Sequence, residues 1–179
     1  MTYFQSLNYD CTAKATFESF TLELTQEHDA DHGEPWKECD GHGPVSDWRP
    51  VREGEKRPGE LVLSVDHGSA RYYDFAAACK LALREGWNAP PYDIPGETKR
   101  QKAARAALAD YKYLKAWCSD NWHYMGLIVT ASKHGIKLAS ASVWGIESTS
   151  GDDYFLEVAN DLAADAIFEA RAAIESLAA

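Results

Sequence analysis

The sequence predicts an α+β fold in which an antiparallel sheet of about four to five strands is covered, mainly on one face, by three helices. Three observations favour this class. Short strand-like segments occur in pairs joined by turns, longer segments show helical spacing of apolar residues, and strands and helices do not alternate as they do around a parallel sheet. The 179 residues, 45% of them hydrophobic, are expected to form a single domain (residues 1–179) with one core.

The first expected strand covers residues 16–24, where apolar and polar side chains alternate imperfectly. Residues 25–59 follow with five glycines and four prolines, too many for a long regular element. This composition predicts a long structured loop or an insertion.

A hairpin is expected next, with short strands over 61–65 and 71–73 joined by a turn at His67-Gly68. Asp74 is a suitable N-cap for a helix that follows the hairpin directly, and Gly86 is a suitable C-cap. The sequence therefore predicts a strand pair that leads straight into a helix.

Thr98 and Gln101 have the spacing of a capping box, which predicts the start of a second helix. Its expected buried face follows the apolar residues at helical spacing. These residues are Ala104, Ala107, Leu108, Tyr111, Leu114 and Trp117.

A second hairpin is expected from strand-like segments over 122–132 and 136–145, because Lys133-His134-Gly135 between them fits a tight turn. Ser150 or Asp152 then caps a final helix that runs to about residue 177. Its expected buried side consists of Phe155, Ala159, Leu162, Ala166, Ala170, Ala173 and Leu177.

The composition argues against several classes of partner. The formal net charge of −10 repels phosphate backbones and anionic lipids, so neither direct nucleic-acid binding nor membrane binding is expected. The four cysteines show no CxxC spacing, which indicates a reducing compartment. No signal peptide or membrane span is recognisable, and the expected location is the cytoplasm.

One loop segment is rich in side chains that bind metals. His28, His32, Cys39, Asp40 and His42 lie within fifteen positions, but no HExxH motif and no calcium-binding loop frame accompany them. A metal-binding enzyme or regulator built on residues 28–42 is one alternative. Because no catalytic motif is present, the leading expectation is a protein that is not an enzyme and uses no cofactor.

Four acidic residues in the final helix recur at every fourth position: Glu157, Asp161, Asp165 and Glu169. They would line up on one side of the helix, about 6 Å apart. Like charges at this spacing destabilise a helix by about 0.2–0.5 kcal/mol per pair. This acidic strip is either a solvated helix face or a surface that meets a basic partner.

Two further features suggest interaction surfaces. Trp36 and Trp48 lie in the polar segment 25–59 and either fix it to the body of the protein or anchor a partner. The cations over residues 99–105 open the second helix, where they oppose its dipole. They would suit an acidic part of the same protein or of a second copy, and the second case makes a homo-oligomeric accessory protein another alternative.

Several stretches resemble a family of small acidic proteins encoded in tailed-phage and prophage genomes. They are PWKECDGHGPVSDW (35–48), KRPGE (56–60), ARYYDFAAACKLALREGW (70–87), DNWHYMGLIVT (120–130) and SVWGIES (142–148). The resemblance carries no catalytic residues. It implies an accessory factor, for instance an inhibitor of host defence of the anti-CRISPR or anti-restriction type.

The leading hypothesis is therefore a phage-encoded binding protein that inhibits a host defence complex. Its acidic strip, Glu157 to Glu169, would compete for a groove that binds nucleic acid, with Trp36 and Trp48 as further contacts. The partner would be a host protein or nucleoprotein complex with a basic surface.

Overall fold

The computed structural model describes residues 2–52, 56–92 and 94–178 and confirms the α+β class. The chain divides into two compact units. Unit 1 comprises residues 1–32 and 123–179, and unit 2 comprises Gly33–Trp122. Two hydrophobic clusters are present where one core was expected, one in each unit. Among the helices of the described ranges, none combines the length and the apolar character needed to cross a membrane.

Unit 1 is built on a four-stranded antiparallel sheet with the strand order β1-β2-β6-β7. The strands are β1 (Ala13–Phe17), β2 (Phe20–His28), β6 (Tyr124–Lys133) and β7 (Ile136–Glu147). The expectation of a single strand over 16–24 was wrong, since Glu18 adopts a φ of +53° and the chain turns there between β1 and β2. The hairpin turn at His134-Gly135 is confirmed, with φ values of +52° and +78°.

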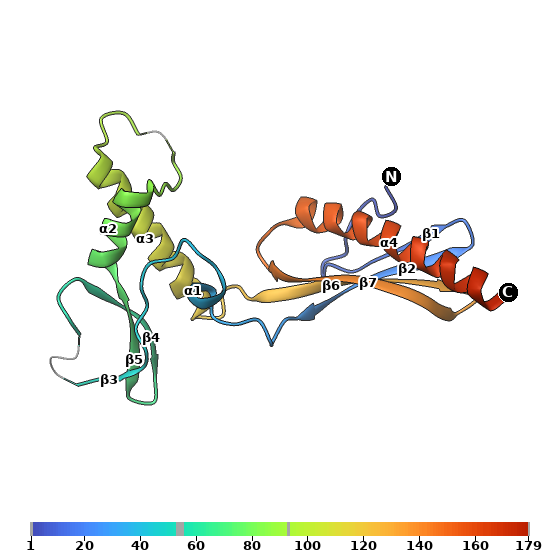
Figure 1. The fold of residues 1–179 in the computed structure, drawn as a ribbon, viewed down its shortest axis with the longest axis horizontal. Helices are drawn as coiled ribbons and strands as arrows, with labels where there is room; N and C mark the ends of the chain where they lie inside the picture. Colours follow the sequence, from blue (N-terminus) through green and yellow to red (C-terminus); the bar gives the residue numbers. More distant parts are fainter. Residues whose placement is uncertain (1, 53–55, 93, 179) are drawn as a thin grey trace. The chain divides into compact units, whose positions relative to one another are not determined.

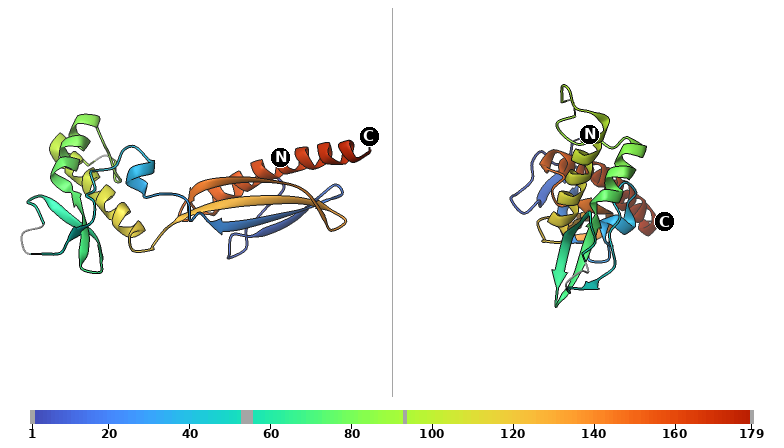
Figure 2. Two further views of the ribbon diagram at one scale, coloured as in Figure 1. Left: turned by 60° about the horizontal axis from the view of Figure 1, so that its bottom comes forward. Right: turned by 90° about the vertical axis from the view of Figure 1, so that its left-hand side faces the viewer.

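Helix α4 (Asp152–Ala178) lies along one face of this sheet and packs mainly on β6 and β7 (Figures 1 and 2). The predicted buried side is largely correct, because Phe155, Ala159 and Ala166 are at most 2% exposed. Opposite them, Leu24 and Leu127 are fully buried. Leu177 was predicted wrongly, as it is 83% exposed near the end of the helix.

Unit 2 contains a smaller antiparallel sheet with the strand order β3-β5-β4, drawn in green in Figure 1. Its strands are β3 (Arg49–Pro50), β4 (Glu60–Asp66) and β5 (Ser69–Asp74), and the turn at His67-Gly68 is as predicted. The segment 25–59 is more ordered than its composition indicated. Strand β2 extends into it, and it also contains the short helix α1 (Pro35–Glu38) and β3; part of it, 53–55, lies outside the described residues.

Helices α2 (Phe75–Glu85) and α3 (Lys99–Trp117) pack against each other and on β4. The predicted caps are confirmed: the Asp74 side chain accepts a hydrogen bond from the Ala77 amide, Gly86 ends α2 with a φ of +73°, and Thr98 and Gln101 form a capping box. The buried face of α3 differs from the prediction at Leu108, which is 39% exposed. Ala107 is fully buried as predicted, and two further small side chains, Ala103 and Ala106, are buried beside it.

Candidate functional site

The two units differ sharply in charge. Unit 1 carries 14 of the 28 acidic residues but only 4 of the 18 basic ones, a net charge of −10, whereas the 14 acidic and 14 basic residues of unit 2 cancel. The whole formal charge of the protein therefore belongs to unit 1.

The acidic strip occupies the side of α4 that faces away from the sheet. Glu157, Asp161, Asp165 and Glu169 are all exposed. The residues on the opposite side of the helix, which face the sheet, are buried. None of the four forms an ion pair with another residue in the described part of the chain. Their charges are accordingly available to a partner.

Two exposed aromatic side chains lie on the same side of α4. Phe168 is 75% exposed and Tyr154 46% exposed. Seven residues make nearly two helical turns, so Tyr154, Asp161 and Phe168 follow one another along the helix at intervals of about 10 Å. We call the acidic strip together with Tyr154 and Phe168 the α4 face.

The aromatic residues of the α4 face were missed in the sequence-based prediction of the site. Their seven-residue spacing is present in the sequence, but it becomes informative only once the buried side of the helix is known. Exposed aromatic side chains aligned with charged ones offer apolar contact area to a partner, and tyrosine is enriched among residues that dominate binding energy.

The two tryptophans predicted to bind a partner belong to unit 2. Trp36 packs edge-on against Trp117, with ring centroids 5.5 Å apart, and contributes to the core of that unit. Trp48 is 41% exposed, and its ring stacks on the Arg71 guanidinium at 4.8 Å. Trp36 therefore fixes its loop to the body of unit 2, and Trp48 remains accessible.

The residues proposed as metal ligands are distributed over both units. His28 and His32 belong to unit 1, where their rings contact His123 and Tyr124, respectively. Cys39 and Asp40 are exposed in unit 2. In the described ranges no group of three or more His, Cys, Asp or Glu side chains is arranged to hold a metal ion.

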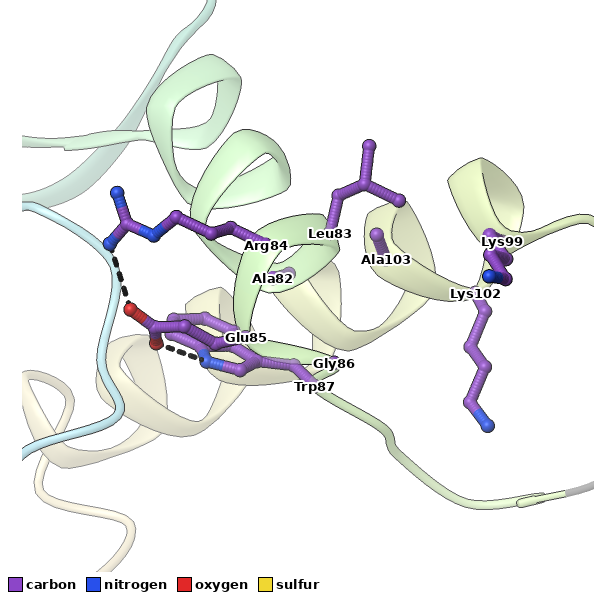
Figure 3. A pocket seen from close by; sticks show the side chains of 9 residues that line it. All are labelled: Ala82, Leu83, Arg84, Glu85, Gly86, Trp87, Lys99, Lys102 and Ala103. Atoms are coloured by element: carbon purple, nitrogen blue, oxygen red, sulfur yellow. Dashed lines mark hydrogen bonds and ion pairs between the residues drawn. The ribbon is translucent and has the colours of Figure 1, made fainter.

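One of the cations in the first two turns of α3 forms an ion pair within unit 2. Arg105 forms a two-pronged ion pair with Glu97 at 2.8 Å and also bonds the Ala89 carbonyl oxygen, which ties the α2–α3 connection to α3. The cations Lys99 and Lys102 line a pocket of about 360 Å³ between the end of α2 and the start of α3. Figure 3 shows these lysines on one side of the pocket and, on the other, Glu85 bonded to both Arg84 and the Trp87 indole.

A partly buried polar network lies in unit 2 and joins His42, Tyr73 and Asp110. The Asp110 carboxylate is 2.6 Å from His42 Nδ1, and it accepts hydrogen bonds from the Gly43 amide at 2.8 Å and the Tyr73 hydroxyl at 2.7 Å. Burial, reinforced by the Asp110 carboxylate, raises the pKa of Tyr73 far above its ordinary value. Tyr73 therefore stays protonated as a donor.

Comparison with known proteins adds no relative to these observations. No protein-family model matches the chain, and searches of curated proteins and of solved structures also found no match.

Proposed function

We propose that the protein is a non-enzymatic binding protein whose α4 face docks on a basic surface of a partner protein, at a site that otherwise holds nucleic acid. The concentration of the net charge of −10 in unit 1 is the observation that carries this proposal. Complementary charge speeds association and selects the partner, while a desolvated aromatic side chain supplies much of the affinity. The α4 face offers both.

The spacing of the acidic strip sets how closely it can imitate nucleic acid. Its charges follow one another at about 6 Å, against one phosphate per 3.4 Å along each strand of a duplex. The strip therefore presents roughly every second charge of a strand, with Tyr154 and Phe168 in positions to stack. Such a surface suits competition for a basic groove.

The resemblance to phage and prophage proteins suggests a bacterial partner. On this proposal the partner is a host complex that handles nucleic acid, of the kind used in defence, and the protein acts inside the host cell as its inhibitor.

Charge reversal tests the proposal. Tagged protein is used to capture partners from a bacterial lysate at about 0.1 M and about 1 M salt, since the Debye length falls from about 10 Å to about 3 Å between them. Replacing all four strip residues with lysine should abolish the capture of a salt-sensitive partner, and an excess of duplex DNA should displace it from the wild type.

A matched control separates the position of the charges from their number. Four exposed acidic residues of unit 2, namely Glu38, Asp40, Asp47 and Asp66, are replaced with lysine, which changes the net charge equally. This variant should retain the partner. Capture that survives reversal of the strip, or that is lost equally in both variants, would contradict the proposal.

The aromatic contribution has its own control on the same helix. Phe168→Ala should weaken binding of the captured partner by at least tenfold, as expected for an anchor residue. Leu177→Ala removes another exposed apolar side chain from α4 and should leave binding unchanged. Equal effects of the two substitutions would remove Phe168 from the docking surface.

A further inference from the structure

A second pocket in unit 2 is independent of the α4 face. It has a volume of about 470 Å³, within the range of small-molecule sites. Three parts of unit 2 line it: the loop at Gly41-His42, the α2–α3 connection at Trp87-Asn88-Ala89, and one side of α3. Because Arg105 ties this connection to α3, the pocket is formed in advance of any ligand.

The walls of the pocket suit a flat apolar molecule. The rings of Tyr113 and His42 are nearly parallel, with an interplanar angle of 12° and centroids 5.6 Å apart. Trp87 lines the pocket as well, and its indole N–H is already bonded to Glu85 at 3.0 Å. Two alanines on α3, Ala106 and Ala109, also line the pocket and add only methyl groups to its wall.

The Asp110 network orients the histidine in this pocket. Asp110 Oδ2 accepts hydrogen bonds from both Gly43 and Tyr73, and we assign the Nδ1 proton of His42 to the bond with Asp110 Oδ1. In the neutral tautomer with this Nδ1 proton, the lone pair lies on Nε2. No partner of Nε2 is found among the residues that the structure describes, and His42 itself lines the pocket.

The side chains of Asp110 and Asn88, which also line the pocket, already have hydrogen-bond partners. Asp110 accepts three hydrogen bonds, and the Asn88 side chain bonds the Ala89 amide and the Tyr92 carbonyl oxygen. We propose that this pocket binds a small, flat, neutral molecule with an apolar body and one O–H or N–H donor, of the phenol or indole class, which donates to His42 Nε2.

Phenol and anisole test the proposal, since they have similar shapes but only phenol has a hydrogen-bond donor. Binding is followed by the methyl signals of Ala106 and Ala109 in protein labelled with ¹³C-alanine. Phenol should shift these signals saturably, and anisole should require at least fivefold higher concentrations. Equal binding of the two probes, or no saturable shift with either, would overturn the proposal.

Two substitutions locate the binding. His42→Phe keeps a flat ring beside Tyr113 but removes the acceptor, so phenol and anisole should then bind alike. Ala109→Leu fills the pocket without touching the Asp110 network and should abolish the Ala106 shift, which keeps the test decisive if His42→Phe fails to fold. Lys112→Leu changes an exposed site on α3 outside the pocket and should leave the preference for phenol over anisole unchanged. A phenol-induced shift that survives Ala109→Leu would refute the assignment.

Discussion

Unit 1 and unit 2 have nearly equal lengths but use charge in opposite ways. Unit 1 has ten more acidic than basic residues and leaves the acidic strip unpaired in the described ranges, while unit 2 balances its charges and buries several in defined networks. In unit 2 the charged groups are tied into contacts that hold loops in place. In unit 1 the acidic strip is directed to solvent, which is where a partner would meet it.

The largest effects are expected from the two cores, where each substitution should act on its own unit. Leu127→Ala in unit 1 and Leu114→Ala in unit 2 each remove a fully buried side chain and should destabilise the unit by about 2–5 kcal/mol. Residue-resolved hydrogen exchange measures the stability of both units in each variant. If either substitution loosens both units equally, the two do not unfold separately and the comparison fails.

An arginine from each unit provides the next comparison. Arg71 of unit 2 is 13% exposed, pairs with Glu34 and lies between Trp36 and Trp48, so Arg71→Ala should cost about 3 kcal/mol. Arg171 of unit 1 is half exposed and pairs with Glu18, and Arg171→Ala should cost less than about 1 kcal/mol. Urea denaturation of both variants gives the two values, and a similar cost for both would contradict the contrast.

Lowering the pH should change the stability of the two units differently, by a smaller amount than the substitutions above. Burial alone would raise the pKa of Glu34 and of Glu60, but hydrogen bonds to Lys37 and Arg71, and to the Arg57 amide and Arg49, lower both pKa values below the ordinary range. Their stabilising effect is complete above the unfolded-state pKa of about 4.3 and is lost as the pH falls through the lower folded-state values.

Unit 2 should therefore lose stability below about pH 4, where protonation relieves the mutual repulsion of acidic groups in unit 1. Residue-resolved hydrogen exchange between about pH 5 and pH 3 compares the two, with rates corrected for their intrinsic pH dependence. Earlier loss of protection in unit 1 would reverse the expected order.

The smallest expected effect is a gain in stability rather than a loss. Asp161→Asn with Asp165→Asn removes three like-charge pairs at i, i+4 along α4 and should stabilise unit 1 by up to about 1 kcal/mol. Thermal unfolding of the double variant measures the gain. Asp47→Asn with Asp66→Asn in unit 2 is the control and should give no comparable gain. A destabilised strip variant would mean that these acids support the fold rather than a partner.

Features that depend on neighbouring residues were predictable from the sequence. The capping box at Thr98, the caps Asp74 and Gly86, and the turn at His134-Gly135 each need only a few adjacent positions, and all were predicted correctly. The exposed acidic strip also followed from the helical period alone.

Features that depend on distant residues were not predictable in the same way. Leu24 pairs with Val129 across the sheet, and His42 meets Asp110, 68 positions further along the chain. Periodicity carries no information about such pairs. The buried face of α3 was partly mispredicted for a related reason. Ala103 and Ala106 are buried in the packing of unit 2, although larger apolar residues such as Leu108 had the stronger hydrophobic signal.

Unit 2 is inserted between β2 and β6, and this position allows it to be replaced by another segment. His28 at the end of β2 pairs with Met125 near the start of β6, and the Asp29 amide bonds the Tyr124 carbonyl oxygen at 2.9 Å, so the chain leaves unit 1 and re-enters it at adjacent points. A hairpin turn of a few residues would bridge that gap. Unit 2 is thus an insertion between two neighbouring strands of an antiparallel sheet. A different domain could be inserted at the same point without changing the α4 face.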